Sequence, residues 1–152
     1  MTDVAPGTQG RLLLASDHAG FELKKLVRAH LESSGYEVHD LGTESRESTD
    51  YPDYAHRLAD KLLAGMAPFG ILICGSGVGM GMAANRHRGV RAVVCSDTFS
   101  AHAARQHNNA NVLCLGERVV GPGLALDIVD AFLTAEFEGG RHERRVDKID
   151  AQ

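Results

Sequence analysis

The sequence predicts an α/β protein with a doubly wound, five-stranded, mostly parallel sheet of Rossmann-like type and helices on both faces. Short apolar runs of strand length alternate along the chain with amphipathic segments of helix length. Crossovers between parallel strands are right-handed, so this alternation leads to a sheet that is covered on both faces. The 152 residues, 43% of them hydrophobic, are sufficient for one domain with a sizeable core.

The first half of the chain is predicted to contain two strands and two helices. Residues 11–16 form an apolar strand, and residues 21–35 form a helix that stops at a glycine. Residues 36–42 form a second strand and residues 43–53 a polar loop. Residues 54–65 then form a helix with its leucines on one face.

The second half repeats the alternation. A buried strand over residues 69–74 precedes a glycine loop and a helix through residues 83–85, and the strand 90–95 leads to the helix 98–108. A strand over residues 110–116 and an amphipathic helix over residues 121–137 follow. Residues 1–10 have no periodicity and are predicted to be a flexible extension, so residues 11–152 form a single domain with a helical C-terminal tail.

Composition excludes several classes of function. The net charge of −4 and the pI near 6.0 argue against a nucleic-acid partner, although the segment "GRHERR" is a local basic patch. No apolar run is long enough for a membrane helix, and the first ten residues lack the features of a signal peptide. Three cysteines in no paired spacing fit reduced thiols and show no zinc pattern. We therefore expect a cytoplasmic protein without a membrane or nucleic-acid partner.

Ligands of doubly wound sheets bind at the carboxyl ends of the strands, and this chain carries a glycine loop after one of them. Four glycines remove side chains so that backbone N–H groups can converge on an anion; they are Gly75, Gly77, Gly79 and Gly81. Cys74 is the last strand residue before these donors, which would favour its thiolate as a nucleophile or base. The alternative is a small buried hydrophobe, which is the better interpretation of Cys95 and Cys114.

Two other functions are compatible with this loop. Gly79, Gly81 and Ala84 satisfy one variant of the dinucleotide fingerprint, with Asp97 near the distance of a ribose-binding acid. Against it, Gly79 comes about one helical turn too late after the strand, and little chain is left for a substrate domain. A non-catalytic sensor of sugar phosphates or nucleotides on the same fold is the third hypothesis.

Five blocks in order resemble a known family, the type B ribose-5-phosphate isomerases with their galactose-6-phosphate and allose-6-phosphate isomerase relatives. The blocks include "SDHAGFELK", "TDYPDYA", "GILICGSGVGMGMAANRHRGVRAV", "AARQHNNANVLCLGERVVG" and "FEGGRHERRV". The resemblance implies an aldose–ketose isomerase that acts through a cis-enediolate without metal or other cofactor. Its expected substrate is ribose 5-phosphate, with ribulose 5-phosphate as product; allose 6-phosphate, galactose 6-phosphate and a tetrose phosphate remain alternatives.

The resemblance also implies roles for residues of the loop and of the helix 98–108. Cys74 corresponds to the base that removes the C2 proton, and the N–H groups of Gly75, Gly77 and Gly79, assisted by Ser76, would bind the enediolate. Some relatives carry a carboxylate base where this chain has Met80. His107 corresponds to the ring-opening acid and Asn108 to a group that holds sugar oxygens; without the resemblance, a histidine at a helix end is more often a cap or a surface residue.

Further residues correspond to the family's substrate contacts. Asp17 and His18 would contact the sugar and its phosphate, although "SDHAG" is also typical of a helix N-cap. Tyr51, in the polar loop, would contact substrate or simply pack beneath that loop. Arg141 and Arg145, four residues apart, would clamp the phosphate together with His18, whereas an isolated "RHERR" is usually a solvated tail. Arg118 is a weaker candidate for the same role.

The resemblance implies a homodimer or homotetramer, with active sites near the subunit interface and the apolar helix 121–137 as a dimer element. The remaining histidines receive no role from their spacing and suggest no metal site; they are His30, His39, His56, His87, His102 and His142.

Overall fold

A computed structural model describes residue 7 and residues 9–151 of the chain. Its strands form one sheet in the order β2-β1-β3-β5-β4, and all four pairings are parallel. The strands are β1 (Arg11–Ser16), β2 (Glu37–Asp40), β3 (Phe69–Cys74), β4 (Ala92–Val94) and β5 (Val112–Gly116). The predicted doubly wound α/β fold is therefore confirmed, with a sheet that is entirely parallel.

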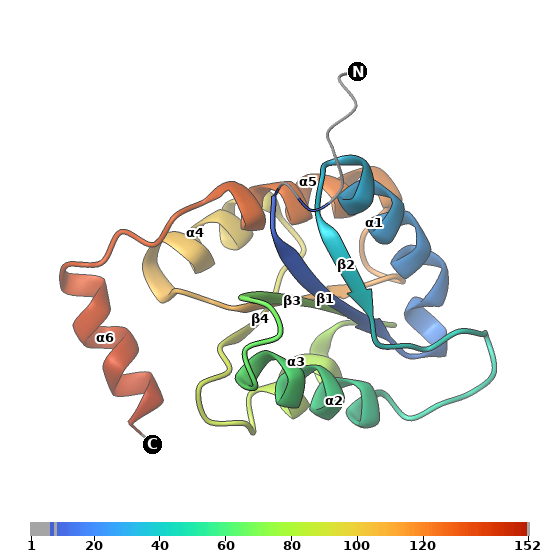
Figure 1. Cartoon of the computed structure of the whole chain (residues 1–152), viewed down its shortest axis with the longest axis horizontal. Helices are drawn as coiled ribbons and strands as arrows, with labels where there is room; N and C mark the ends of the chain where they lie inside the picture. Colours follow the sequence, from blue (N-terminus) through green and yellow to red (C-terminus); the bar gives the residue numbers. More distant parts are fainter. Residues whose placement is uncertain (1–6, 8, 152) are drawn as a thin grey trace.

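The helices cover both faces of this sheet (Figure 1). They are α1 (Phe21–Ser33), α2 (Tyr51–Leu63), α3 (Val78–Ala84), α4 (Thr98–Asn108), α5 (Pro122–Thr134) and α6 (Arg141–Asp150), and the 3₁₀ turn η1 (His18–Gly20) precedes α1. Helices α1, α4 and α5 pack in one core cluster, and α2 and α3 pack in the other. Helix α6 lies at the side of the molecule, beside α4 (Figure 1).

Alternation along β3 determines which way its side chains point. Ile71 and Ile73 belong to the core beneath α1, α4 and α5, whereas Leu72 and Cys74 belong to the core beneath α2 and α3. Successive strand residues face opposite sides of a sheet, so this partition follows from the period of two. Cys74 therefore ends its strand on the side where α2 and α3 lie.

Two helix boundaries differ by three residues from the sequence prediction. Helix α2 begins at Tyr51, before the expected Tyr54, so Tyr51 is a helical residue and the prediction that it lies in a loop is wrong. Pro52 explains the early start, because proline is favoured in the first turn, where its missing N–H has no helical partner. Helix α5 ends at Thr134, and residues 135–140 connect it to α6.

The apolar residues of α5 are used within the chain itself. Ala125, Ile128, Val129 and Phe132 are fully buried in the core that α5 shares with α1 and α4. Burial of a large aliphatic or aromatic side chain stabilises the folded chain by about 2 kcal/mol. These four residues are therefore used within the chain, and the role of the helix as a dimer element stays a prediction.

The chain enters the sheet through an ordered segment. Gln9 donates a backbone hydrogen bond to Gly35 O at 3.1 Å, and Glu37 donates one to Gly10 O at 2.9 Å. The described end of the expected flexible extension is thus attached beside β2, whereas residues 1–6 and 8 lie outside the described residues. Among the helices of the described chain, none is long and apolar enough to cross a membrane.

Candidate active site

The strand order creates one candidate site at the carboxyl ends of β1 and β3. The chain adds β2 on one side of β1 and β3 on the other, so the connections that follow β1 and β3 diverge. Such a switch point is where doubly wound sheets bind ligands. A cavity of about 550 Å³ opens there, and the predicted site residues that line it are Asp17, His18, Tyr51, Cys74, Gly75, Ser76, Gly79 and Arg118.

Cys74 lies at the inner end of this cavity. Its side chain is almost fully buried, and its sulfur accepts a hydrogen bond of 3.1 Å from the N–H of Gly77. The segment that follows β5 also binds the loop, because the backbone N–H of Glu117 donates to Cys74 O and the backbone N–H of Arg118 donates to Gly75 O. The thiol is therefore held in the loop with a backbone donor directed at its sulfur.

The glycines of the loop serve different purposes. Gly77 has a φ of 81°, in the left-handed region that favours glycine, and Gly79 leaves space for the ring of Tyr51, which a Cβ there would approach to 2.5 Å. The N–H groups of Gly75, Ser76 and Gly79 have no acceptor within the described residues. These residues line the cavity, so they provide donors for an oxyanion.

Asp17 and His18 continue the chain where β1 ends. Asp17 is buried, and its Oδ1 accepts hydrogen bonds from Ala19 and Gly20, which confirms the expected N-cap. His18 Nδ1 accepts a hydrogen bond of 3.1 Å from the N–H of Thr49. In the neutral imidazole this places the proton on Nε2, so His18 can donate a hydrogen bond from its other nitrogen.

Arg118 is the only guanidinium among the residues that line this cavity. It lies over the loop, with Nη1 3.1 Å from the point that a Cβ on Gly75 would occupy. Its neighbour Glu117 accepts a hydrogen bond of 2.6 Å from the N–H of Leu23, in the first turn of α1. Glu117 and Thr49 thus support the site, although no role was predicted for either residue. Glu117 follows a strand, and both residues lie in blocks that carry the family resemblance.

His107 and Asn108 lie at the amino ends of the strands, whereas Cys74 lies at the carboxyl ends. Helix α4 leaves the carboxyl end of β4 and leads to the amino end of β5, so its last residues lie where the strands begin. There Gly70 N donates to Asn111 O at 3.0 Å. Eleven helical residues span about 16 Å, so within one chain the cavity at Cys74 does not include His107 or Asn108.

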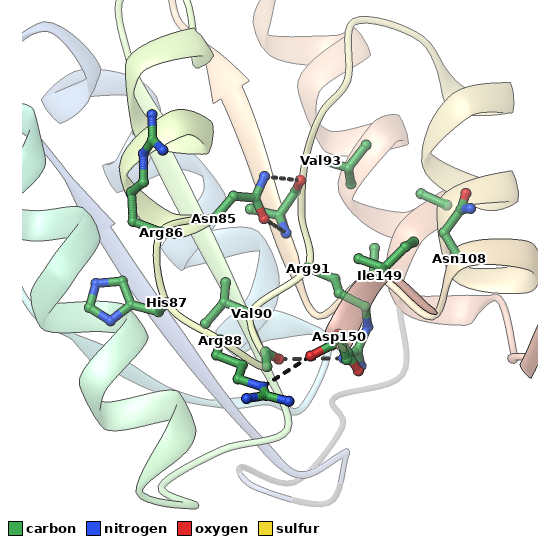
Figure 2. A pocket seen from close by; sticks show the side chains of 14 residues that line it. Asn85, Arg86, His87, Arg88, Val90, Arg91, Val93, Asn108, Ile149 and Asp150 are labelled. Carbon is green, nitrogen blue, oxygen red and sulfur yellow. Dashed lines mark hydrogen bonds and ion pairs between the residues drawn. The ribbon is translucent and has the colours of Figure 1, made fainter. Parts of the chain in front are cut away.

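A second cavity, of about 410 Å³, opens at that edge between α4, α6 and the segment before β4 (Figure 2). Asn108 lies on its rim. Asp150 closes its lower side, because its carboxylate pairs with Arg91 at 2.9 Å and its carbonyl accepts from Arg88 at 3.0 Å. These contacts attach the end of α6 to the body of the molecule.

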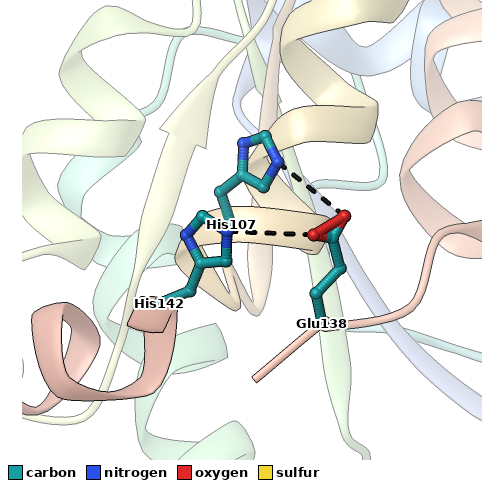
Figure 3. A group of neighbouring side chains, drawn as sticks. All are labelled: His107, Glu138 and His142. Carbon is teal, nitrogen blue, oxygen red and sulfur yellow. Dashed lines mark ion pairs between the residues drawn. The ribbon is translucent and has the colours of Figure 1, made fainter. Parts of the chain in front are cut away.

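The start of α6 is attached through His107. The rings of His107 and His142 stack with centroids 4.5 Å apart, and Glu138 stands beside both (Figure 3). Burial, reinforced by neighbouring positive groups, lowers the pKa of His142 below its usual value. Arg141 and Arg145 lie on this same helix, away from the cavity at Cys74.

The remaining cysteines and the dinucleotide motif have structural explanations. Burial raises the pKa of Cys95 to about 11 and also raises that of Cys114, so both thiols stay protonated near neutral pH. Asp97 Oδ1 caps α4 by accepting from Ser100 N at 2.6 Å. Gly81 lies inside α3 against Val94. Asp97 and Gly81 therefore have structural roles, as a helix cap and as a packing contact, and the dinucleotide interpretation loses its basis.

Comparison with known proteins points to one family. A family model described as Ribose/Galactose Isomerase matches residues 12–149. Ribose-5-phosphate isomerase B of Escherichia coli K12 is 53% identical over 141 residues, which cover 93% of this chain and 95% of the relative. A putative sugar phosphate isomerase of Bacillus subtilis is 45% identical and covers 91% of this chain and 94% of its own length.

Solved structures show the same similarity. A ribose 5-phosphate isomerase from Thermotoga maritima superposes with a TM-score of 0.92 at 54% identity, over 93% of this chain and 98% of that one. Ribose-5-phosphate isomerase B from Mycoplasma genitalium, solved with bound ribulose-5-phosphate, has a TM-score of 0.89 at 48% identity, over 93% of this chain and 94% of its own.

Proposed function

The chain belongs to the ribose/galactose isomerase family, and we propose that it is an aldose–ketose isomerase that interconverts ribose 5-phosphate and ribulose 5-phosphate. The observation that carries this proposal is the cavity in which one buried thiol, a set of free backbone donors, a histidine and an arginine converge. The similarity to an isomerase solved with ribulose-5-phosphate supports the choice of substrate.

The chemistry needs a base, donors for a developing oxyanion and a proton carrier. The thiolate of Cys74 takes the C2 proton of the open-chain aldose, and the electron pair of the broken C–H bond forms the C1–C2 double bond of a cis-enediolate. The negative charge develops on O1, which the N–H groups of Gly75, Ser76 and Gly79 can stabilise. Return of the proton from sulfur to C1, with transfer of the O2 proton to O1, gives the ketose.

The polar residues around the thiol hold the substrate during these steps. The buried Asp17 uses Oδ1 for its cap, which leaves Oδ2 to accept from a sugar hydroxyl. His18 donates from Nε2, and Tyr51 limits the cavity where its ring contacts Gly79. Arg118 supplies a positive charge beside the loop, which stabilises the negative charge of the enediolate.

A second copy of the chain completes this site in our proposal. The cavity at Cys74 is not lined by His107, Asn108, Arg141 or Arg145 of the same chain, although the family resemblance gives all four a role at the substrate. Exposed apolar side chains stand close to the mouth of the cavity; Val78, Met82 and Val119 line it, with exposed fractions of 48%, 65% and 58%. A two-fold dimer would cover this surface and bring the partner's α4 and α6 to it.

The first experiment follows ketose formation from ribose 5-phosphate in nucleotide-free buffer treated with a chelator. We expect turnover by the wild type and a loss of about a thousandfold or more in Cys74→Ala. Cys95→Ala is the matched control, because that thiol is buried outside the cavity, and it should retain activity. Absence of turnover by the folded wild-type protein would contradict the proposal, and galactose 6-phosphate and allose 6-phosphate would then be tested.

Binding of ribose 5-phosphate to the same proteins separates an enzyme from a sensor. A sensor binds the sugar phosphate without turning it over, and its Cys74→Ala variant binds equally well. The isomerase requires both binding and turnover in the wild type, so binding alone would argue against it.

A further inference from the structure

The fold brings three potential metal ligands together at the junction of α4 and α6. His107 Nε2 lies 3.9 Å from Glu138 Oε1, and His142 Nε2 lies 3.8 Å from Glu138 Oε2. One ligand atom from each of the three residues lies within 4.8 Å of the other two. Figure 3 shows the two imidazoles, from α4 and α6, beside the carboxylate of Glu138, with a dashed line from each ring to that carboxylate.

The backbone supports this arrangement. Glu138 donates its N–H to Gln106 O at 3.0 Å, which attaches the segment before α6 to the last turn of α4. His142 lies in the first turn of α6 and is buried, whereas His107 and Glu138 remain partly exposed. The three side chains thus form one cluster that is buried at His142 and open to solvent at His107 and Glu138.

We propose that His107, Glu138 and His142 bind a borderline divalent cation, Zn²⁺ above all, in a tridentate site with at least one open position. Zinc prefers imidazole nitrogen and carboxylate oxygen in tetrahedral geometry, with bonds of about 2.0–2.2 Å. Ligand atoms in such a site are about 3.3 Å apart. The three ligand atoms here lie within 4.8 Å of one another, so their separations need to shrink by up to about 1.5 Å. Imidazoles also disfavour Mg²⁺ and Ca²⁺, which take oxygen ligands.

The charges around the cluster act in both directions. Arg141 and Arg145 lie on the same helix and repel a cation, and the carboxylate of Glu138 opposes them. The balance favours a reversible site of moderate affinity, suited to regulation by free metal rather than to a resident cofactor.

Occupancy of this site should inhibit the enzyme. This consequence rests on the proposed function, in which His107 opens the sugar ring as an acid. Coordination takes the lone pair of Nε2, so His107 can no longer exchange a proton there. The metal also links α4 to α6 and thereby restricts Arg141 and Arg145, the proposed phosphate clamp.

Equilibrium dialysis and calorimetry with Zn²⁺ alone test the binding itself. We expect one equivalent of zinc per chain, and an affinity that falls by at least about tenfold in Glu138→Gln. Glu143→Gln is the matched control, because Glu143 is an exposed acid in the first turn of α6 and lies outside the cluster. No zinc binding by the wild type, or equal affinity in Glu138→Gln, would overturn the proposal.

Co²⁺ identifies the ligands. A site made of two imidazoles and a carboxylate gives weak d–d absorption, whereas Cys74 as a ligand would add an intense thiolate-to-cobalt charge-transfer band. The proposal requires the first spectrum, and it also requires that the spectrum persist in His56→Asn. His56 forms a separate exposed pair with His87, at 2.6 Å, and loss of the spectrum in that variant would place the metal there instead.

Isomerase activity in the presence of zinc tests the second step. The rate of each protein is compared with its own rate without zinc. Zinc should inhibit the wild type and Glu143→Gln at the same zinc concentration, whereas inhibition of Glu138→Gln should require a zinc concentration about tenfold higher. If zinc binds as described but ribose 5-phosphate is not turned over at all, the proposed function fails and the metal site stands. If turnover occurs and saturating zinc leaves it unchanged, the inhibitory role is wrong.

Discussion

Gly79 and Tyr51 are in direct contact across the cavity wall: a Cβ on Gly79 would stand 2.5 Å from Cε2 of the ring and 3.0 Å from the hydroxyl. The contact joins the second residue of α3 to the first residue of α2. The glycine therefore determines where the tyrosine ring lies relative to Cys74.

Gly79→Ala should displace the Tyr51 ring and lower kcat/KM for ribose 5-phosphate by about 10- to 100-fold, because small misplacements in a site are costly. Alanine is the better helix former, so the melting temperature should not fall in proportion. The control is Gly123→Ala in α5, where a Cβ would meet nothing within 4 Å. Steady-state kinetics and thermal unfolding of both variants measure these effects, and full activity in Gly79→Ala would refute the positional role.

Mixed dimers test whether two copies share each site. Cys74→Ala and His107→Asn should each be inactive alone, since the proposed base and acid come from different subunits. After unfolding and refolding together in equal amounts, about a quarter of the wild-type activity should return, because half the dimers are mixed and each has one intact site. Sites built within single subunits would leave the mixture inactive.

Lys24 is the buried anchor of the loop that leads to α2. Its side chain is 2% exposed, and its ammonium contacts Asp40 Oδ1 at 2.6 Å and the carbonyl of Thr43. Lys24→Met should lower the free energy of unfolding by about 3 kcal/mol, since it leaves a largely buried carboxylate without this partner. Arg28, 3.3 Å from Asp40 Oδ2, compensates only in part.

Lys25→Met is the comparison for that variant. Lys25 is the next residue on α1, but its ion pair with Glu22 is at the surface, with both side chains at least 40% exposed. Its loss should cost about 0.5 kcal/mol or less. Urea unfolding measures both variants, and equal effects would mean that burial of the Lys24 ion pair contributes nothing.

Cys95 makes stability depend on pH in alkaline solution. Its pKa is raised to about 11, mainly by burial and further by Asp97, whereas an ordinary cysteine titrates near 8.5. Between these values the unfolded chain has lost the thiol proton and the folded chain retains it, so the free energy of unfolding falls as pH rises from about 9 to 11. Below pH 8 this thiol does not make the free energy of unfolding depend on pH.

In Cys95→Ala the free energy of unfolding should therefore fall less steeply between pH 9 and 11 than in the wild type. The difference in slope should correspond to the release of up to about one proton on unfolding. Cys114 acts in the same direction and remains in this variant, so the slope should decrease without vanishing. Urea titrations at several pH values under reducing conditions provide the slopes. Parallel curves for the two proteins would show that Cys95 is not responsible.

Much of the fold was predictable from the sequence because it depends on local pattern. The apolar run 69–74 and the segment 98–108 coincide with β3 and α4, since strand and helix periodicities are properties of neighbouring residues. The start of α2 was missed, because Tyr51 and Pro52 follow a polar stretch and lie outside the leucine pattern. The positions of Asp17 and Cys74 at strand ends also placed them at one edge of the sheet in advance.

What the sequence determined by itself is the order of strands and helices, the residues that follow each strand, and the family. The tertiary structure alone decided which of those residues meet. The strand order sets Asp17 beside Cys74, whereas the direction of α4 carries His107 to the amino ends of the strands. There the connection between α5 and α6 brings Glu138 to it, and the first turn of α6 brings His142. Local periodicity specifies an element and its faces, but proximity across dozens of residues depends on how the elements pack, and no spacing along the chain records that.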